Sequence, residues 1–386
     1  MWRDSPLGRR LAAHLAAWDR DGRLRTLRPP SGIDLSSNDY LNLSRHPNLV
    51  RAFADAARDE GVGSTGSRLL RGERERFSQL EARFARFKGA ERALYFSSGY
   101  LANLAVLTTL AEPGDVIFSD ALNHASLVDG IRLTRARRQI FPHLDVGQLE
   151  ALLRAESGSG VRFVAVESVF SMEGDLAPLA DLLDVCRRFE AVLIVDEAHA
   201  VGVFGTSGQG IVAHDEVRDV VCVSVSSADK ALGAAGAFVA GPASLVEYLV
   251  QRARPFVLST AAPPATAAAI EASLDLVHAE PWRRQLVLDL AARLRRRLEA
   301  DGIFPEGTSQ ILPIVIGPNA QALAVAERLR AEGFDVRAIR PPSVPEGTAR
   351  LRVSINAGLT ADVVDRFADA VSPACQDAGL TCAASS

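Results

Sequence analysis

The segment VLIVDEAH, residues 192–199, is the part of the chain that best indicates the fold. Four apolar residues lead directly into Asp196, a pattern typical of a strand buried on both faces of a parallel sheet. Ligands of such sheets bind beyond the carboxyl ends of the strands, where Asp196 and His199 would lie. A carboxylate at that place can keep a bound ring nitrogen protonated. The alternative is a strand that ends in a capping Asp, with His199 at the surface or in the core.

Short apolar runs of the same kind recur along the first two thirds of the chain and alternate with helical patterns. They cover residues 93–97, 116–119, 161–167, 220–225 and 237–240, and several are rich in β-branched residues. The stretches 101–110 and 179–189 between them have helical character. This alternation predicts an α/β fold with a mainly parallel sheet that is covered by helices.

A change of pattern after Pro263-Pro264 indicates a second, smaller unit. Residues 265–301 predict long helices. Further on we expect strands at 311–316, 335–339 and 349–355 and helices at 320–332 and from 360. We therefore expect an N-terminal helix from about residue 5, followed by a basic, proline-ended connector over 24–30, within an arm over 1–44. A large domain over 45–280 and a small C-terminal α/β domain over 281–376 would follow. The small, polar residues 377–386 would form a disordered tail.

The composition of the 386-residue chain is that of a globular protein, with 48% hydrophobic and 23% charged residues. A net charge of −4 argues against a general basic surface for nucleic acid or an anionic membrane. We expect arginines such as Arg135, Arg137 and Arg138 on solvated helix faces. The first residues lack the apolar run of a signal peptide, and no stretch approaches the length of a membrane span.

The cysteines suggest no metal or redox site, because none pairs in a Cys-x-x-Cys motif. Two of them have apolar neighbours and are expected in the core, and a reducing cytoplasmic location fits this usage. The four cysteines are Cys186, Cys222, Cys375 and Cys382.

The segment SSADKALG, residues 226–233, follows the apolar run 220–225. A lone lysine at such a place is usually a solvated side chain, and this is the alternative for Lys230. Gly233 and Gly236, with the alanines between them, would leave room for a bulky group close to the backbone. An amine in such a pocket can have a lowered pKa and condense with an aldehyde. Ser227 could donate its hydroxyl to a phosphate beside it.

Three earlier strand ends also carry groups that suit a phosphorylated aromatic ligand. Gly99 and Tyr100 lie in a turn between a strand and a helix, where free N–H groups and the helix dipole can bind phosphate. His124 could stack on a planar ring, and Ser171 could bond a phenolic oxygen. Each has an ordinary alternative as a turn residue, a core aromatic or a helix cap. All five strand ends together predict a site for a phosphorylated pyridine at one sheet edge.

With these motifs the chain resembles the α-oxoamine synthases, a family of pyridoxal-phosphate-dependent transferases of fold type I. The resemblance extends from about residue 34 to 370 and rests on SSNDYL at 36–41, NHASL at 123–127 and DEAH at 196–199. The segment IRPPSVPEGTARLR, residues 339–352, is most similar to the members that form 8-amino-7-oxononanoate in biotin synthesis.

The resemblance implies an acyltransferase that condenses L-alanine with a pimeloyl thioester of coenzyme A or acyl carrier protein and releases CO₂. Pyridoxal 5′-phosphate would be the cofactor, carried on the amine of Lys230, which would also move protons. Asp196 would pair with the ring nitrogen, and His124 would stack on the ring. The other implied cofactor contacts are Gly99, Tyr100, Ser171, His199 and Ser227.

The resemblance also implies substrate positions and a partner subunit. Arg352 would bind a carboxylate through the bidentate geometry of its guanidinium. A homodimer is expected, and Ser259 or Thr260 would then reach the phosphate in the partner's site. The implied substrate-binding residues are Arg25, Asn38, His124, Ser343 and Arg352.

Asp229 is the main departure from the family pattern, in which the residue before the lysine is usually Gly or Ser. Its charge could repel the phosphate if it points inward. A related synthase such as glycine C-acetyltransferase is the alternative within the class, and a non-catalytic protein of the same fold is the alternative outside it. A nicotinamide-dependent enzyme is not favoured, since no Gly-x-Gly-x-x-Gly follows an early strand.

Overall fold

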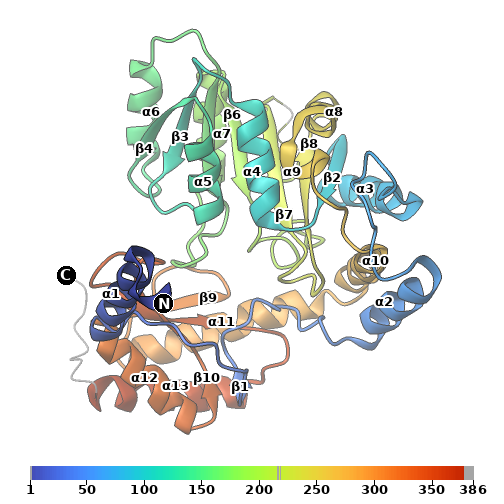
Figure 1. The fold of residues 1–386 in the computed structure, drawn as a ribbon. Helices are drawn as coiled ribbons and strands as arrows, with labels where there is room; N and C mark the ends of the chain where they lie inside the picture. Colours follow the sequence, from blue (N-terminus) through green and yellow to red (C-terminus); the bar gives the residue numbers. More distant parts are fainter. Residues whose placement is uncertain (1, 215–216, 218, 378–386) are drawn as a thin grey trace.

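The computed structural model describes residues 2–214, 217 and 219–377 (Figure 1). Its largest sheet has the strand order β2-β8-β7-β6-β5-β3-β4. The strands are β2 (Arg92–Phe96), β3 (Val116–Asp120), β4 (Arg137–Phe141), β5 (Arg162–Glu167), β6 (Val192–Asp196), β7 (Cys222–Ser227) and β8 (Ala237–Gly241).

Strand direction places the predicted site groups at one edge of this sheet. β8 pairs antiparallel with both β2 and β7, whereas the neighbouring pairs from β7 to β4 are parallel. All strands except β8 therefore run in the same direction, and the carboxyl ends of β2, β3, β5, β6 and β7 share one edge. The mainly parallel sheet predicted from the sequence is confirmed.

Helices cover both faces of the sheet. On one face lie α4 (Gly99–Leu110), α5 (Ala125–Leu133), α8 (Ala243–Arg252) and α9 (Arg254–Val257), and on the other lie α6 (Val146–Ala155) and α7 (Leu179–Arg188). Ile194 packs into the first layer, whereas Leu193 and Val195 pack into the second. This double burial explains why β6 is an unbroken apolar run in the sequence.

A second sheet, of order β11-β12-β9, lies in the C-terminal part of the chain, drawn below the large sheet in Figure 1. It consists of β9 (Ile311–Gly317), β11 (Ala338–Ile339) and β12 (Ala349–Ser354) and is antiparallel. α11 (Trp282–Ala300), α12 (Asn319–Ala331) and α13 (Ala361–Asp377) pack with it around one apolar core. The carboxyl edge of the large sheet faces this unit, so the site lies between the two sheets.

The N-terminal elements extend around the outside of these two units. They are η1 (Trp2–Asp4), α1 (Pro6–Arg20), β1 (Ile33–Asp34), α2 (Pro47–Glu60) and α3 (Glu75–Lys88); α10 (Pro264–Ala279) packs against α2. α1 ends at Arg20, before the predicted connector over 24–30, and the chain beyond it lies against the C-terminal unit, where the Asn319 amide donates to the Asp21 carbonyl at 2.9 Å.

Two expectations from the sequence are wrong. Arg137 and Arg138 lie on β4 and not on a helix, because this sheet-edge strand has polar residues in place of an apolar run. The strand predicted over 335–339 is divided into β10 (Phe334–Asp335), which pairs with β1, and β11, which pairs with β12. The two short strands therefore belong to different sheets.

Several other sequence features can be placed in the structure. Cys186 and Cys222 are buried, as expected. In the described part of the chain no helix is both long and apolar enough to cross a bilayer. Most of the predicted tail, residues 378–386, lies outside the described residues and includes Cys382.

Candidate active site

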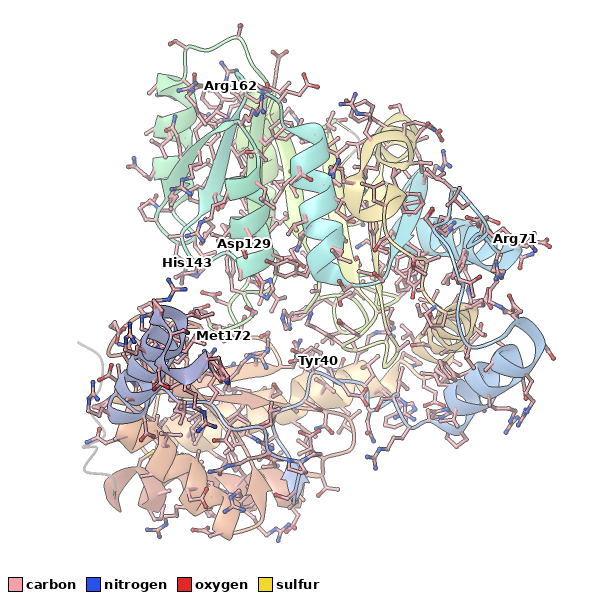
Figure 2. The ribbon with its side chains drawn as sticks, in the orientation of Figure 1. Tyr40, Arg71, Asp129, His143, Arg162 and Met172 are labelled. Carbon is pink, nitrogen blue, oxygen red and sulfur yellow. The ribbon has the colours of Figure 1, made fainter. Side chains whose placement is uncertain are left out.

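A cavity of about 420 Å³ lies at the carboxyl edge of the large sheet. Its volume falls within the range of small-molecule sites. Figure 2 shows Asp129 at the end of the large unit that faces the C-terminal unit, with Tyr40 and Met172 between the two, whereas Arg162 lies at the opposite edge. The cavity brings together many of the predicted site residues: Asn38, Gly99, Tyr100, His124, Asp196, His199, Ser227 and Lys230.

Asp196 is held at the end of β6 by two donors, and its side chain faces α4. Its Oδ2 accepts a hydrogen bond from the Asn103 amide at 2.6 Å, and its Oδ1 accepts one from the Ala198 backbone N–H at 2.9 Å. The residue is 5% exposed. Both donors are neutral, so the carboxylate keeps its charge available for a cationic group in the cavity.

A chain of hydrogen bonds links Asp196 to His124. Asn103 uses its second amide hydrogen to donate to the Ser126 hydroxyl at 2.8 Å, and that hydroxyl lies 2.7 Å from Nδ1 of His124. The same Nδ1 accepts from the Ser126 backbone N–H. Burial lowers the pKa of His124, so the ring is neutral and carries its hydrogen on Nε2. Sequence analysis missed Asn103 and Ser126, because an Asn within a helix and a Ser after a helix cap are common.

His199 lies against Tyr40, a residue that the sequence motif contained but to which no role was given. The Tyr40 hydroxyl is 2.7 Å from Nδ1 of His199, and Gln310 donates to the His199 carbonyl at 2.8 Å. Burial, together with the positive charges of Lys230 and Arg352, lowers the pKa of His199 well below its ordinary value. A neutral imidazole is therefore fixed in the wall of the cavity.

Lys230 and the predicted phosphate-binding groups line the part of the cavity beside the first turn of α4. Ser227 faces the first turn of α4, since a methyl group built on Gly99 would lie 3.6 Å from its hydroxyl oxygen. The Ser98 hydroxyl caps α4 by accepting from the Leu101 N–H at 3.3 Å. Because the other N–H groups of a first helical turn have no intrahelical partner, this end of the cavity can bind an anion.

The prediction that Gly233 and Gly236 leave room for a bulky ligand near Lys230 is wrong. Gly233 and Gly236 have φ angles of 63° and 98°, and an added Cβ would approach the Ser44 backbone nitrogen to 2.6 Å and the Tyr95 ring to 2.4 Å. These positions need glycine because of backbone conformation and close protein contacts. They do not provide space for a ligand.

Glu167 is a cavity residue that sequence analysis did not single out. It pairs across the strands with Asp196, so both side chains point to the same face of the sheet. Burial and the nearby Asp196 charge raise the pKa of Glu167 well above its ordinary value. Its Oε2 accepts from the Ser171 N–H at 3.1 Å, whereas Oε1 has no partner among the described residues.

Arg352 lies behind Asn38 and Tyr40, on β12 of the C-terminal unit. Its guanidinium donates to Asn38 Oδ1 at 3.0 Å, to the Ser171 carbonyl at 2.5 Å and to the Tyr40 hydroxyl at 3.3 Å. Arg352 is 7% exposed, and no carboxylate in the described part of the chain forms an ion pair with it. Buried charges are usually paired, so this cation favours binding of an anionic ligand. Ser171 meets Arg352 through its backbone and is not in the cavity lining.

Four predicted residues lie away from the cavity. Arg25 and Ser343 are together, 3.3 Å apart, in a separate groove of about 960 Å³ between the 24–31 arm and the C-terminal unit. Ser259 and Thr260 lie beside Arg68 in a different small pocket. The structure of one chain therefore does not bring these residues to Lys230.

The residues of the cavity fit a pyridoxal 5′-phosphate group. The cavity lining includes a buried carboxylate for a ring nitrogen, and a helix start, a hydroxyl and an amine for a phosphate and an aldehyde. The buried oxygens Oε1 of Glu167 and Oδ1 of Asn103 have no partner among the described residues, although buried polar atoms rarely lack one. No cluster of His, Cys, Asp or Glu that could hold a metal ion occurs in residues 2–214, 217 and 219–377.

Comparison with known proteins gives the family. The model of the aminotransferase class I and II family matches residues 30–371. An 8-amino-7-oxononanoate synthase of Anaeromyxobacter dehalogenans is 45% identical over 381 residues, which are 95% of this chain and 96% of the relative. The chain belongs to the 8-amino-7-oxononanoate synthase group of this family. The family predicted from the sequence motifs is confirmed.

Solved structures agree with this assignment. A variant of serine palmitoyltransferase from S. paucimobilis, solved with a bound PLP–myriocin aldimine, superposes with a TM-score of 0.89 over 97% of this chain and 100% of the other, at 27% identity. The 8-amino-7-oxononanoate synthase from Francisella tularensis gives a TM-score of 0.78 over 91% and 99%, at 30% identity. These similarities confirm the predicted fold type.

Proposed function

We propose that the protein condenses L-alanine with a pimeloyl thioester to form 8-amino-7-oxononanoate, CO₂ and the free thiol carrier, a step of biotin synthesis. The membership of nearly the whole chain in the synthase group supports this acyltransferase activity. The observation that carries the proposal is that Asp196 and Lys230 line one cavity, at the edge where the strand directions predict a ligand. A cytoplasmic location is part of the same proposal.

Pyridoxal 5′-phosphate is the cofactor. When bound, it supplies an aldehyde that reacts with amines and a pyridine ring that withdraws electrons from the substrate α-carbon. Asp196 would face the ring nitrogen and stabilise its protonated form, because opposite charges attract strongly in a buried site. His124 would lie against the ring, and neutral His199 would contact the phenolic oxygen, with Ser171 nearby.

The amine of Lys230 would hold the cofactor and later carry the proton that leaves or returns to the α-carbon of alanine. The first turn of α4 at Gly99 and Tyr100, with the Ser227 hydroxyl, would bind the phosphate. Tyr100 is also held in place, since its hydroxyl donates to Asp129 at 2.5 Å.

Arg352 would bind the carboxylate of alanine. The guanidinium is buried beside the cavity residue Asn38 and has no carboxylate partner among the described residues. An arriving carboxylate would supply the missing negative charge and form charge-assisted hydrogen bonds. Asn38 would orient the guanidinium toward the substrate.

The acyl donor would use the groove of Arg25 and Ser343. The apolar side chains of Leu323 and Ile339 line this groove together with arginines that include Arg340. An apolar acyl chain and an anionic carrier suit such a surface. In a homodimer, which we also propose, Ser259 or Thr260 would reach the phosphate in the partner's site.

The product assay tests this function against its relatives. We expect CO₂ release from L-alanine with pimeloyl-coenzyme A or pimeloyl carrier protein, and formation of 8-amino-7-oxononanoate. Serine with palmitoyl-coenzyme A is a necessary comparison, because the serine palmitoyltransferase superposes with the higher TM-score, although its 27% identity is well below the 45% of the synthase. Preference for that pair, or for glycine with acetyl-coenzyme A, would contradict the proposal.

A further inference from the structure

Asp229 is hydrogen-bonded to Ser227, the residue whose hydroxyl would bind the phosphate of the cofactor. The Ser227 hydroxyl donates a hydrogen bond to Oδ1 of Asp229. A serine hydroxyl has a single hydrogen to donate. As long as that hydrogen bonds to Asp229, it cannot bond to a phosphate oxygen.

The position of Asp229 also puts a negative charge beside the phosphate-binding groups. Asp229 lines the same cavity as Ser98, Gly99 and Ser227. Lys230, with Nζ at 3.7 Å from Oδ1, is the cation nearest to it among the described residues, and the Asp229 side chain is 46% exposed. A phosphate dianion at the first turn of α4 would therefore meet a carboxylate that is only partly compensated.

We propose that Asp229 sets how much more tightly the site binds pyridoxal 5′-phosphate than pyridoxal, because Asp229 competes with the phosphate group for the Ser227 hydroxyl. Binding of the phosphate requires the hydroxyl to rotate from Asp229 to a phosphate oxygen and the carboxylate to turn toward solvent. The proposal rests on the proposed cofactor site. It predicts weaker phosphate-dependent binding than in the same site without an acid at this position.

Variants of Asp229 separate the two parts of this competition. Asp229→Ser removes both the charge and the carboxylate acceptor, whereas Asp229→Asn removes the charge and keeps an oxygen that can accept from Ser227. Asp184→Ala is a matched control, because it removes a carboxylate that is 59% exposed on α7, away from the cavity. Residue 229 is partly exposed, so we expect all three proteins to fold, which urea unfolding checks.

The experiment titrates the protein freed of cofactor with pyridoxal 5′-phosphate and with pyridoxal, which lacks the phosphate, and follows the absorbance of the bound ring. We expect Asp229→Ser to lower the Kd for pyridoxal 5′-phosphate about tenfold, the size of one charge-assisted hydrogen bond. The Kd for pyridoxal should change less than about twofold, and Asp229→Asn should be intermediate. Inorganic phosphate should also compete better with the cofactor in Asp229→Ser.

An unchanged or higher Kd for pyridoxal 5′-phosphate in Asp229→Ser would overturn the inference, and so would an equal change for pyridoxal. If Asp229→Ser failed to fold, the same criteria would apply to Asp229→Asn. The proposed function is tested separately by the product assay on the unaltered protein. Product formation with unchanged Kd values would reject the inference alone, whereas the predicted Kd values without product would reject the function alone.

Discussion

Asp196 and Glu197 are consecutive residues at the end of β6, but their carboxylates lie on opposite sides of the sheet and have different roles. Asp196 points toward α4 and the cavity, and its bonds come from neutral donors. Glu197 points the other way and forms a fully buried ion pair with Lys88 of α3. Successive side chains at a strand end alternate between faces, so one short motif can provide a charge for chemistry on one side and a fixed pair for stability on the other.

The Glu197 carboxylate and the Lys88 amine each have several hydrogen-bond partners. Oε1 of Glu197 accepts from the N–H groups of Ile211 and Val212 at 2.6 and 2.9 Å. Lys88 Nζ also donates to the carbonyls of Gln209 and Val212 at 2.6 and 2.9 Å. The cavity side instead contains acceptors without partners. This difference indicates which acid is structural and which is free to meet a ligand.

The largest effect should come from breaking the buried pair. Lys88→Met leaves the Glu197 carboxylate without its cation in a site that excludes water, and we expect unfolding free energy to fall by about 3–5 kcal/mol. Urea unfolding followed by circular dichroism measures this. A loss below about 1 kcal/mol would show that Glu197 is not structurally important.

Asp196→Asn should lower activity with little effect on stability, whereas Lys88→Met should mainly lower stability. We expect kcat/KM to fall by about 10²–10³-fold, because the charge that would stabilise the protonated ring is lost. Asn at 196 keeps one oxygen, so one of the two donors to this residue retains its acceptor, and the urea midpoint should fall much less than in Lys88→Met. Equal activity in the two proteins would mean that Asp196 does not face the cofactor.

Asn103→Leu tests the link between Asp196 and His124 with a smaller expected effect. The substitution removes both amide donors, and we expect the Kd for pyridoxal 5′-phosphate to rise about tenfold, as for one hydrogen bond to a charged group. Ser126→Ala removes the hydroxyl contacts to His124 and Asn103 but leaves the bond from Asn103 to Asp196, so it should raise the Kd less. The opposite order would contradict the hydrogen-bond chain.

His143 lies at the same sheet edge as the cavity but outside the cavity lining (Figure 2). Like Glu197, it would therefore affect stability, and its effect should depend on pH. Burial alone would lower its pKa, but hydrogen bonds to Asp120 at 2.9 Å and Asp175 at 2.8 Å raise the pKa of His143 to about 10. A raised histidine pKa stabilises the folded protein fully below the unfolded pKa near 6.5, and this stability is lost as pH rises toward about 10.

We therefore expect the unfolding free energy to decrease by roughly 2–4 kcal/mol between pH 6 and 10 because of this one residue, the lower figure allowing for screening by solvent. His143→Gln should flatten that part of the pH dependence, and the difference between the two proteins removes the contribution of other groups. Parallel pH curves for the two proteins would show that the histidine is not charged in the folded state.

Much of the fold could be predicted from the sequence because both faces of β3, β5, β6 and β7 are covered. Such strands need continuous apolar runs, which are easy to recognise. β4 was missed because it lies at the edge of the sheet and contains RRQIF. The division of residues 335–339 between two sheets depends on partners that are far away in the sequence.

The candidate site shows the same limit. Asp196, His124 and Lys230 follow strands, so strand direction alone predicts that they meet. Asn103 and Tyr40 depend on how α4 and the N-terminal arm pack, and their local sequence gives no such signal. Glu167 ends β5 as Asp196 ends β6, so the same strand-end rule could have found it. The reason assigned to Gly233 and Gly236 was wrong for a related cause, since the neighbours that fill the space are Ser44 and Tyr95.

The central claim is that Lys230 carries pyridoxal 5′-phosphate in the cavity that Asp196 lines. Reduction of the cofactor-loaded protein with borohydride, followed by peptide mass mapping, tests this most directly. We predict that the reduced cofactor remains attached to the peptide containing Lys230, and that Lys230→Ala protein retains none. Labelling at another lysine, or retention of the label in Lys230→Ala, would contradict the assignment.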